Sequence, residues 1–326
     1  MAQPRLDLVT QPIPELMVTD SVRQVLLRVL ACGVCHTDLH LVEGDLPLRK
    51  RPVIPGHQVV AQVVAVNPGE TGLQVGDRVG VPWLFSTCGE CDFCRRGQEN
   101  LCDRAQFTGW DVDGGYAGYM LARPEYVVRI PPEFDDLAAA PLLCAGIIGY
   151  RSLRLAGVQP GDRVGLVGFG ASAHIALQVA GYWRCQVAVF TRSPAHRRLA
   201  EELGAAWTGP SDQAPPWPLD CAVIFAPVGN LVPTILERLR KGGTLAINAI
   251  HMSRLPEMDY NLIYGERIVR TVANATRRDA SEFMALAVEA QVKVETEVFP
   301  LPDANVALLK LKRGDIRGAA VLAPMG

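Results

Sequence analysis

Short apolar runs broken by glycine, proline and aspartate fill residues 21–130 of the chain. Three examples are Val25–Leu30, Val59–Val66 and Asp77–Val81, and the second is followed by the turn signal Asn67-Pro68-Gly69. Apolar runs of this length between such breaks are typical of strands. The pattern therefore predicts a β-rich, barrel-like domain in this part of the chain.

A different pattern begins near residue 145, where apolar strands alternate with helical segments. We expect strands at Arg163–Val167, Val187–Phe190, Cys221–Phe225 and Thr244–Ile250, and helices at Ala173–Gly181, Pro194–Leu203 and Leu231–Arg240. This alternation predicts a doubly wound parallel sheet, so the expected fold class is α/β with a second, β-rich domain. After about residue 275 we expect one more helix, Glu282–Gln291, and then short strands. The predicted domains are 1–144, 145–275 and a tail, 276–326, that returns to the first domain.

Composition narrows the range of partners. The chain has 326 residues, 49% of them hydrophobic and 20% charged, with a net charge of −2 and no long basic run. Nucleic acid and membrane surfaces are therefore poor candidate partners. The N-terminal segment shows no apolar secretory signal, and no apolar run is long enough for a transmembrane helix. Nine cysteines in such a chain favour a reducing, cytoplasmic compartment with thiolate-bound metal.

Four of these cysteines, Cys88, Cys91, Cys94 and Cys102, follow the spacing Cys-x2-Cys-x2-Cys-x7-Cys. Four thiolates around one tetrahedral Zn²⁺ form the usual structural zinc site. An iron–sulfur cluster begins in a similar way but normally ends Cys-x3-Cys-Pro, whereas here seven residues intervene and Asp103 follows. We therefore predict a structural zinc in a lobe over residues 88–102, with a cluster or disulfides as weaker alternatives.

The first strand of the second pattern runs into the sequence Gly-x-Gly-x-x-Ala, made by Gly168, Gly170 and Ala173. In this motif the first glycine permits a tight turn, the second lets the backbone approach a pyrophosphate, and the alanine lets the helix pack closely on the strand. Glycines also end strands at plain turns, but the strand-to-helix context here favours dinucleotide binding.

The residues after the second strand bear on the choice between NAD and NADP. NAD-binding proteins usually have an acid there, which holds the ribose. Here the strand ends in Thr191, Arg192 and Ser193, with Arg197 and Arg198 nearby. No carboxylate would repel a 2′-phosphate and arginines could bind one, so we expect NADP(H) to be preferred and NAD(H) to remain usable. The alternative is that Arg192 is an ordinary surface charge.

Two further cysteines and a histidine are candidates for a second metal site. Cys35 lies in CGVCHTDLH, His57 in IPGHQ and Cys144 in APLLCAGIIGY. Two thiolates and one imidazole leave an open fourth position on zinc, as catalytic sites do. Spacing alone does not show that the three meet, and a single cysteine is more often a small buried residue.

Taken together, these motifs resemble those of the zinc-dependent, medium-chain alcohol dehydrogenases. The resemblance covers nearly the whole chain, with CGVCHTDLH, Pro-Gly-His, Gly-Asp-Arg-Val at 76–79, the four-cysteine lobe and the dinucleotide turn in the family's order. A bacterial subgroup is the most similar, through motifs like FTR, IHMS and ANATR at 190–192, 250–253 and 273–277. The resemblance implies a GroES-like catalytic domain, a Rossmann domain, an active-site zinc in the cleft between them, and pairing into homodimers or homotetramers through the Rossmann sheet edge.

The same resemblance implies two zinc ions per chain. The catalytic zinc would be held by Cys35, His57 and Cys144, and the structural zinc by the four lobe cysteines. Asp38 would accept a hydrogen bond from His57, and a helix cap is the alternative role for this residue.

Roles for other residues follow from the resemblance as well. Thr37 would touch the substrate oxygen, unless it is only a turn hydroxyl. His40 would pass the proton to solvent, unless it is a plain surface histidine. His36 and Arg317 would flank the pyrophosphate, and for Arg317 a generic surface charge is the alternative. The expected lining of the substrate pocket consists of Leu46, Leu84 and Trp110.

Gln58 departs from the family pattern, which usually has a glutamate after the ligand histidine. An amide there carries no charge and is a poorer ligand, so we expect a more electrophilic zinc, slower ligand exchange, and activity that is altered but retained.

The expected activity is reversible hydride transfer between NADP(H) and a primary or secondary alcohol, aldehyde or ketone of medium size. One alternative is a zinc-independent quinone or enone reductase, which would lack the metal ligands. The other is a non-catalytic nucleotide-binding protein on the same scaffold with an impaired zinc site.

Overall fold

The computed structural model describes residues 5–17, 23–67 and 72–324, so the turn expected around Pro68 lies outside the described residues. The chain forms two compact units. Unit 1 comprises the chain up to Cys144, Asn274–Ala285 and the part from Val294 onward. Unit 2 comprises Ala145–Ala273 and Leu286–Lys293, so a short stretch near the end of helix α8 (Arg277–Glu289) belongs to it.

Unit 1 is built on a seven-stranded sheet whose central strand, β1 (Val25–Val34), pairs with three others. The strand order is β14-β15-β1-β2-β3-β7, with β6 also paired to β1. The other strands of this sheet are β2 (Val59–Val66), β3 (Arg78–Val81), β6 (Tyr119–Ala122), β7 (Val128–Arg129), β14 (Thr296–Pro300) and β15 (Ala319–Ala323). The helices and short turns of unit 1 are α1 (His36–Glu43), α2 (Asp92–Arg95), η1 (Glu99–Leu101), η2 (Pro124–Tyr126), α3 (Asp136–Pro141), η5 (Leu301–Asp303) and α9 (Ala304–Arg313).

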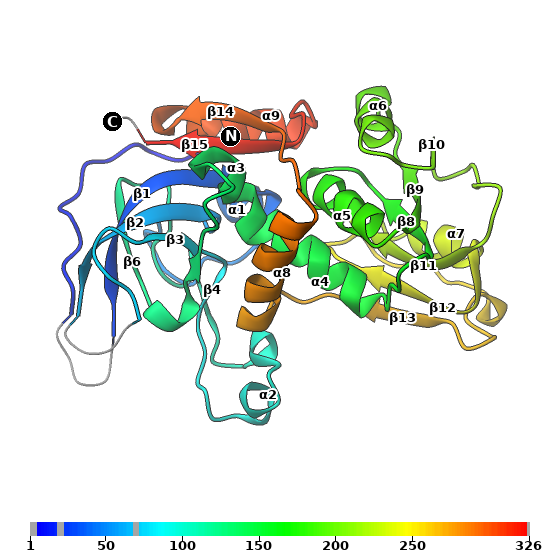
Figure 1. Ribbon diagram of the computed structural model, residues 1–326, viewed down its shortest axis with the longest axis horizontal. Coiled ribbons are helices and arrows are strands. Elements are labelled where there is room, and N and C mark those ends of the chain that lie inside the picture. The colour runs from blue at the N-terminus through cyan, green and yellow to red at the C-terminus, as the bar shows by residue number, and fades with distance from the viewer. Residues whose placement is uncertain (1–4, 18–22, 68–71, 325–326) are drawn as a thin grey trace. The chain divides into compact units, whose positions relative to one another are not determined.

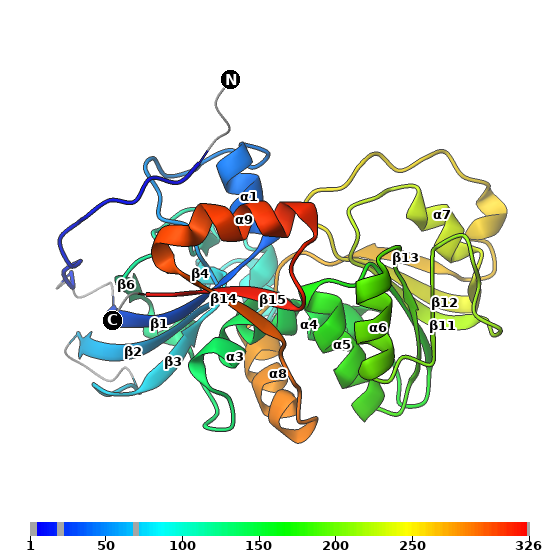
Figure 2. The same ribbon diagram turned by 90° about the horizontal axis from the view of Figure 1, so that it is seen from above.

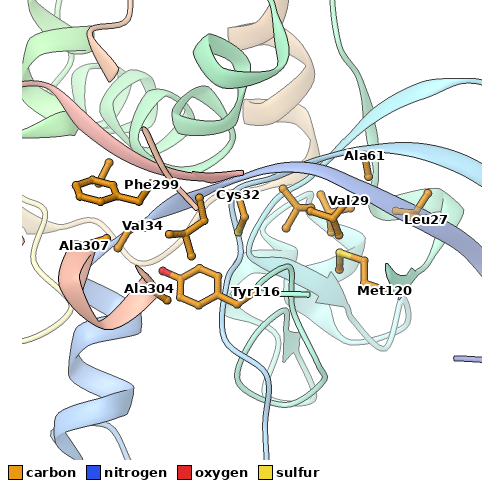
Figure 3. Close-up of a cluster of buried hydrophobic side chains, with 14 of the residues drawn as sticks. Leu27, Val29, Cys32, Val34, Ala61, Tyr116, Met120, Phe299, Ala304 and Ala307 are labelled. Carbon is orange, nitrogen blue, oxygen red and sulfur yellow. The ribbon is translucent and has the colours of Figure 1, made fainter. Parts of the chain in front are cut away.

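The core of unit 1 forms because apolar residues line the inner faces of these strands. Leu27 of β1, Met120 of β6 and Phe299 of β14 belong to one buried cluster, which also includes residues of α9 (Figure 3). A separate small hairpin, β4 (Leu84–Ser86) with β5 (Gln106–Phe107), carries the four-cysteine lobe. Figure 1 shows α2, in this lobe, projecting away from the sheet of unit 1.

Unit 2 contains a six-stranded sheet in which every neighbouring pair is parallel, in the order β10-β9-β8-β11-β12-β13. The strands are β8 (Arg163–Val167), β9 (Gln186–Phe190), β10 (Trp207–Gly209), β11 (Leu219–Ile224), β12 (Leu239–Ile247) and β13 (Ile268–Thr271). The helices are α4 (Ile147–Leu155), α5 (Ala171–Tyr182), α6 (Pro194–Glu202) and α7 (Leu231–Leu236), with a short turn η4 (Tyr260–Leu262). Figure 2 shows α5 and α6 side by side, with α7 on the other side of the sheet. This is the doubly wound order, which reverses direction between β8 and β11 and places ligands at the carboxyl ends of the strands there.

Several expectations drawn from the sequence need correction. The strand expected over Thr244–Ile250 is part of β12, which begins at Leu239 and ends at Ile247, and the helix expected over Glu282–Gln291 is α8, which begins at Arg277 and ends at Glu289. The helix expected over Leu231–Arg240 ends at Leu236, because Leu239 already pairs with Leu219 as the start of β12. The tail contains a second helix, α9, where only strands were expected. Its apolar positions pack on unit 1, whose core includes Ala304, Ala307 and Leu308.

Candidate functional site

Three side chains from different parts of unit 1 meet as one candidate metal site. Cys35 directly precedes α1, His57 lies just before β2, and Cys144 lies in a π-helical turn, η3 (Leu142–Gly146). Their sulfur and imidazole ligand atoms all lie within 4.8 Å of one another. Irregular π-helical turns are frequent at functional sites. The structure thus brings together the three residues for which sequence spacing alone gave no proof of contact.

The ring of His57 is oriented by Asp38, which is fully buried. Asp38 Oδ1 lies 3.1 Å from His57 Nδ1, and Asp38 Oδ2 accepts a 2.9 Å hydrogen bond from the backbone N–H of Cys35. Asp38 therefore caps α1 and orients His57 at the same time, so both sequence-based readings of this residue describe real contacts. His57 Nε2, by contrast, is buried without a hydrogen-bond partner among the described residues. An unpartnered imidazole nitrogen facing two thiol groups is the donor set that zinc requires, so the site fits the metal.

The ionisable side chains of this site shift one another's pKa values. Burial opposes ionisation of His57, but the charge and hydrogen bond of Asp38 raise the pKa of His57 to about 10. A hydrogen bond from Cys144, followed by the interaction with His57, holds the pKa of Cys35 well below its usual value. These interactions favour the thiolate form of Cys35, which is the form that binds a metal ion.

Thr37 and His40 lie on α1, close in the chain to the candidate metal ligand Cys35. Thr37 is buried, and its hydroxyl lies 3.7 Å from Cys35 Sγ. His40 lies one turn along the helix, with its Nδ1 2.8 Å from Asp45 Oδ2. Both side chains thus have positions compatible with the proton path expected from the resemblance, which stays a prediction.

Gln58, the residue after His57, is buried, and its side chain lies against Gly33 of β1. Its backbone carbonyl accepts a 2.9 Å hydrogen bond from Gly33 N–H. A Cβ at Gly33 would come within 2.9 Å of Gln58 Cδ, so the glycine makes room for this side chain. Any ionisable group placed at position 58 would lie in the same buried setting.

The sequence did not predict that an aromatic group lies beside the site. The ring of Trp83 lies 4.6 Å from that of His57, between centroids, and Trp83 also contacts Phe107 and Trp110 edge-on. The Trp110 indole donates to the carbonyl of Pro47 at 2.9 Å, which ties it to the loop that carries Leu46. Trp83 directly precedes the three-residue strand β4, and the short apolar run there gave no sign of which residue faces the site.

Leu46 and Leu84 differ in burial. Leu46 is half-buried, whereas Leu84 is only 4% exposed and packs with Cys102 and Ala105 in the small core of the lobe. Of the three rings in the aromatic group, that of Trp83 contacts the His57 ring. The assignment of Leu46, Leu84 and Trp110 to a substrate pocket stays a prediction.

The four lobe cysteines also form one group. Their sulfur atoms all lie within 4.8 Å of one another, and Cys102 Sγ lies 3.5 Å from Cys88 Sγ. Backbone N–H groups of Glu90 and Cys91 point at Cys88 and lower its thiol pKa to about 6. Four converging thiols with backbone donors fit a structural zinc and stabilise its thiolate ligands.

The glycine-rich turn follows β8 in unit 2, at the point where the strand order reverses. Gly168 has a positive φ of 86°, and a Cβ there would lie 2.9 Å from Ala226 N. Gly170 caps α5, and a Cβ built on it meets nothing within 4 Å, so open space remains beside the helix N-terminus. Ala173 is buried in the first turn. Open space in front of unpaired helix N–H groups fits a dinucleotide pyrophosphate.

The residues predicted to choose the cofactor lie at the end of β9. Arg192 is exposed, while Ser193 caps α6 by accepting from His196 N–H. Arg197 Nε donates to the carbonyl of Thr191 at 3.0 Å, which orders this turn. The segment from β9 into α6 contains no carboxylate before Glu201.

His36 and Arg317, the predicted pyrophosphate neighbours, belong to unit 1. His36 is exposed at the start of α1, and Arg317 Nε lies 3.9 Å from Glu295 Oε2. Their role toward a cofactor stays a prediction.

Residues 21–132 match the alcohol dehydrogenase GroES-like domain family. The chain is 48% identical, over 305 residues, to a probable alcohol dehydrogenase, AdhA, of Mycobacterium tuberculosis (strain CDC 1551 / Oshkosh), covering 92% of this chain and 88% of that one. The cinnamyl alcohol dehydrogenase SbCAD4 of Sorghum bicolor superposes with a TM-score of 0.86 at 30% identity, over 92% and 90% of the two chains. A CAD from Helicobacter pylori, complexed with NADP(H), gives 0.85 at 25% identity, over 92% and 90%.

Across the ranges that the structure describes, no helix has the length and apolar character needed to cross a membrane.

Proposed function

Given that the chain belongs to the zinc-dependent, medium-chain alcohol dehydrogenases and acts as an oxidoreductase on alcohols and aldehydes, we propose that it prefers NADP(H) and reduces medium-sized aldehydes. The family uses zinc and a nicotinamide dinucleotide, NAD or NADP. The observation that carries the cofactor proposal is the turn after β9, where Arg192 is exposed and no acid precedes Glu201. The NADP(H) bound to the Helicobacter pylori CAD supports it.

The proposed catalytic residues all lie in unit 1. Cys35, His57 and Cys144 would hold the catalytic zinc, and the lobe cysteines a second, structural one. When bound, the catalytic zinc acts as a Lewis acid on the substrate oxygen, and the nicotinamide carries the hydride. Because its hydroxyl lies beside Cys35 Sγ, Thr37 would donate its proton to the substrate oxygen during reduction. His40, paired with Asp45, would then return a proton from solvent.

Substrate class is proposed from the aromatic group beside His57. The rings of Trp83, Phe107 and Trp110 contact one another, and Trp83 brings this aromatic group to within 4.6 Å of the His57 ring. Such rings favour planar, aryl-substituted aldehydes through stacking and apolar contact. The cinnamyl alcohol dehydrogenase named among the solved structures supports this choice. The presence of three converging ligands argues against a zinc-independent reductase.

We further propose a cytoplasmic homodimer or homotetramer. The supporting feature is β13, the edge strand of the sheet in unit 2, whose four residues are all exposed. An exposed apolar edge is a template for pairing with a second copy.

The test is a set of initial rates on protein whose zinc content has been measured, with NADPH and NADH in parallel over benzaldehyde, cinnamaldehyde and butanal. We expect faster turnover with NADPH and the highest kcat/KM with cinnamaldehyde. Arg192→Ala should raise KM for NADPH about tenfold and leave KM for NADH unchanged, because it removes one charge-assisted contact to a phosphate. Arg184→Ala is a matched control, since Arg184 lies in unit 2 before β9.

Three outcomes would count against the proposal. Preference for NADH would refute the proposed preference for NADP(H) but not the dehydrogenase activity. Turnover of butanal above the aryl aldehydes would refute the substrate class. A chain with one zinc and no turnover would support the non-catalytic alternative and point to Gln58 as its origin.

A further inference from the structure

Tyr116 reaches the buried Asp38 from a segment that is far away along the chain. Its hydroxyl donates to Asp38 Oδ2 at 3.2 Å, and its ring is buried in the core of unit 1. In Figure 3 the hydroxyl oxygen of Tyr116 points away from Met120, toward the end of the core where α1 lies.

The carboxylate of Asp38 has a full set of donors only when Tyr116 is counted. Oδ1 accepts from Gly56 N–H at 3.1 Å and faces His57 Nδ1. Oδ2 accepts from Cys35 N–H and from the Tyr116 hydroxyl. A carboxylate offers about four lone-pair directions, so two donors on each oxygen satisfy it and fix its rotation.

The backbone around Tyr116 is fixed against the segment that leads into His57. Gly114 N–H donates to the carbonyl of Ile54 at 2.8 Å, Gly115 N–H to that of Gly56 at 3.0 Å, and Tyr116 N–H to that of Pro55 at 3.0 Å. A Cβ at Gly114 would lie 2.0 Å from Gly56 O. The close approach therefore depends on the lack of a side chain there.

We propose that Tyr116 is a positioning residue for the three-ligand site, locking the Asp38 carboxylate so that it holds the His57 ring in its metal-binding orientation. The inference rests on the proposed function, because it assumes zinc at Cys35, His57 and Cys144.

The physical argument concerns rotation of the carboxylate. Without the hydroxyl, Oδ2 keeps only the Cys35 donor, and no water replaces the lost one in a fully buried place. The carboxylate can then turn about its Cβ–Cγ bond, which loosens Oδ1 against His57 Nδ1. Partners of this kind orient metal-bound histidines and strengthen their binding.

The test compares Tyr116→Phe with wild type and with Tyr119→Phe, in the zinc-loaded enzyme. Tyr119 lies three residues on, in β6, and has no contact with Asp38 among the described hydrogen bonds. The first readout is the rate at which dipicolinate removes zinc. The four-cysteine site supplies an internal control, because its ligands lie in the separate lobe. The second readout is the visible absorption of the cobalt-exchanged enzyme, whose bands report the geometry of thiolate and imidazole ligands.

We expect Tyr116→Phe to speed zinc loss from the three-ligand site by about 3- to 10-fold, to shift the cobalt bands, and to leave loss from the lobe unchanged. We expect kcat to fall while KM for the cofactor stays constant. Tyr119→Phe should behave as wild type.

Unchanged zinc loss and cobalt bands in Tyr116→Phe would overturn the inference. Equal acceleration at both zinc sites, or the same change in Tyr119→Phe, would also overturn it by showing a general loss of stability. If the wild type itself held one zinc, the proposed function would fail and this inference with it. Two zincs in the wild type and an unaffected Tyr116→Phe would refute the role of Tyr116 alone.

Discussion

At the scale of single residues, the charges around His57 determine how metal binding at this site depends on pH. His57 has a pKa raised to about 10, chiefly through Asp38 against the effect of burial, and it is therefore protonated in the metal-free protein near neutral pH. The pKa of Cys144 is raised well above its usual value by its hydrogen bond with Cys35 and by burial, so this thiol also keeps its proton. The pKa of Cys35 is held well below its usual value by its hydrogen bond with Cys144 and by the interaction with His57, against the effect of burial.

Zinc uptake at this site should therefore release protons. A metal ligand must be deprotonated, so His57 and Cys144 should each release a proton when zinc binds near neutral pH. Calorimetric titration of zinc into protein emptied only at this site, in buffers of different ionisation enthalpy, measures the number. Because protons compete with zinc, affinity should rise with pH up to the His57 pKa of about 10. Release of no protons would contradict this account.

The raised pKa also has a consequence for the stability of the metal-free protein. Its folded value lies above the ordinary value of 6.5. The protonated His57 therefore contributes stability that is fully present below about pH 6.5 and is lost as pH rises through about 10. Zinc-loaded protein should show no such loss over that range.

Gln58 offers a second residue-scale prediction. Replacing it with glutamate adds a buried negative charge at the residue after His57, which should make loss of a proton from an alcohol substrate harder. We expect Gln58→Glu to move the acidic limb of the pH profile for alcohol oxidation to higher pH by about one unit, and to speed zinc exchange. Gln62→Glu, in β2, is the matched control. Unchanged turnover and zinc retention in Gln58→Glu would show that the idea is wrong.

At the scale of elements, residues 114–116 hold the segment that leads into His57, because their backbone N–H groups donate to the carbonyls of residues 54–56. Gly114→Ala would force a methyl group to within 2.0 Å of Gly56 O unless the backbone moves. We expect a loss of roughly 1–3 kcal/mol in the free energy of unfolding, measured by urea denaturation of the zinc-loaded protein, together with faster zinc loss.

Gly118→Ala is the control for this prediction. A Cβ at Gly118 meets nothing within 4 Å, so its replacement should change the free energy of unfolding little. Equal loss in the free energy of unfolding by both variants would mean that the close approach of Gly114 to Gly56 does not contribute specifically to stability.

Much of the element structure was predictable because its cause is local. Arg163–Val167 and Val59–Val66 are strands with the predicted bounds, since apolar runs between breakers specify strands by themselves. The end of α7 was not predictable, because the pairing of Leu239 with Leu219 depends on a partner strand distant in sequence. The contacts of Trp83 and Tyr116 were missed for the same reason, since each depends on a fold that brings distant segments together.

At the scale of the whole molecule, the exposed edge strand β13 bears on assembly. Ile268 is 52% exposed and Val269 is 38% exposed at the edge of the six-stranded sheet. If two copies pair through this edge, Ile268→Lys should shift the protein toward monomer, because a lysine on an edge strand opposes strand pairing. Light scattering after size-exclusion chromatography measures the mass.

Val306→Lys is the control for the assembly prediction, since Val306 is a similarly exposed apolar residue on α9. It should leave the mass unchanged. An Ile268→Lys protein with the wild-type mass would show that assembly, where it occurs, uses another surface.

The π-helical turn at Leu142–Gly146 also matters to anyone who wishes to exchange cofactor modules between enzymes. Cys144 is the last residue of unit 1, and Ala145 opens unit 2, so the boundary cuts through a single irregular turn. A chimera spliced between these two residues would place a foreign half-turn directly after Cys144, a proposed zinc ligand. The junction should follow Gly146, where the regular helix α4 begins. The whole turn, including Cys144, then stays with the β-rich unit 1.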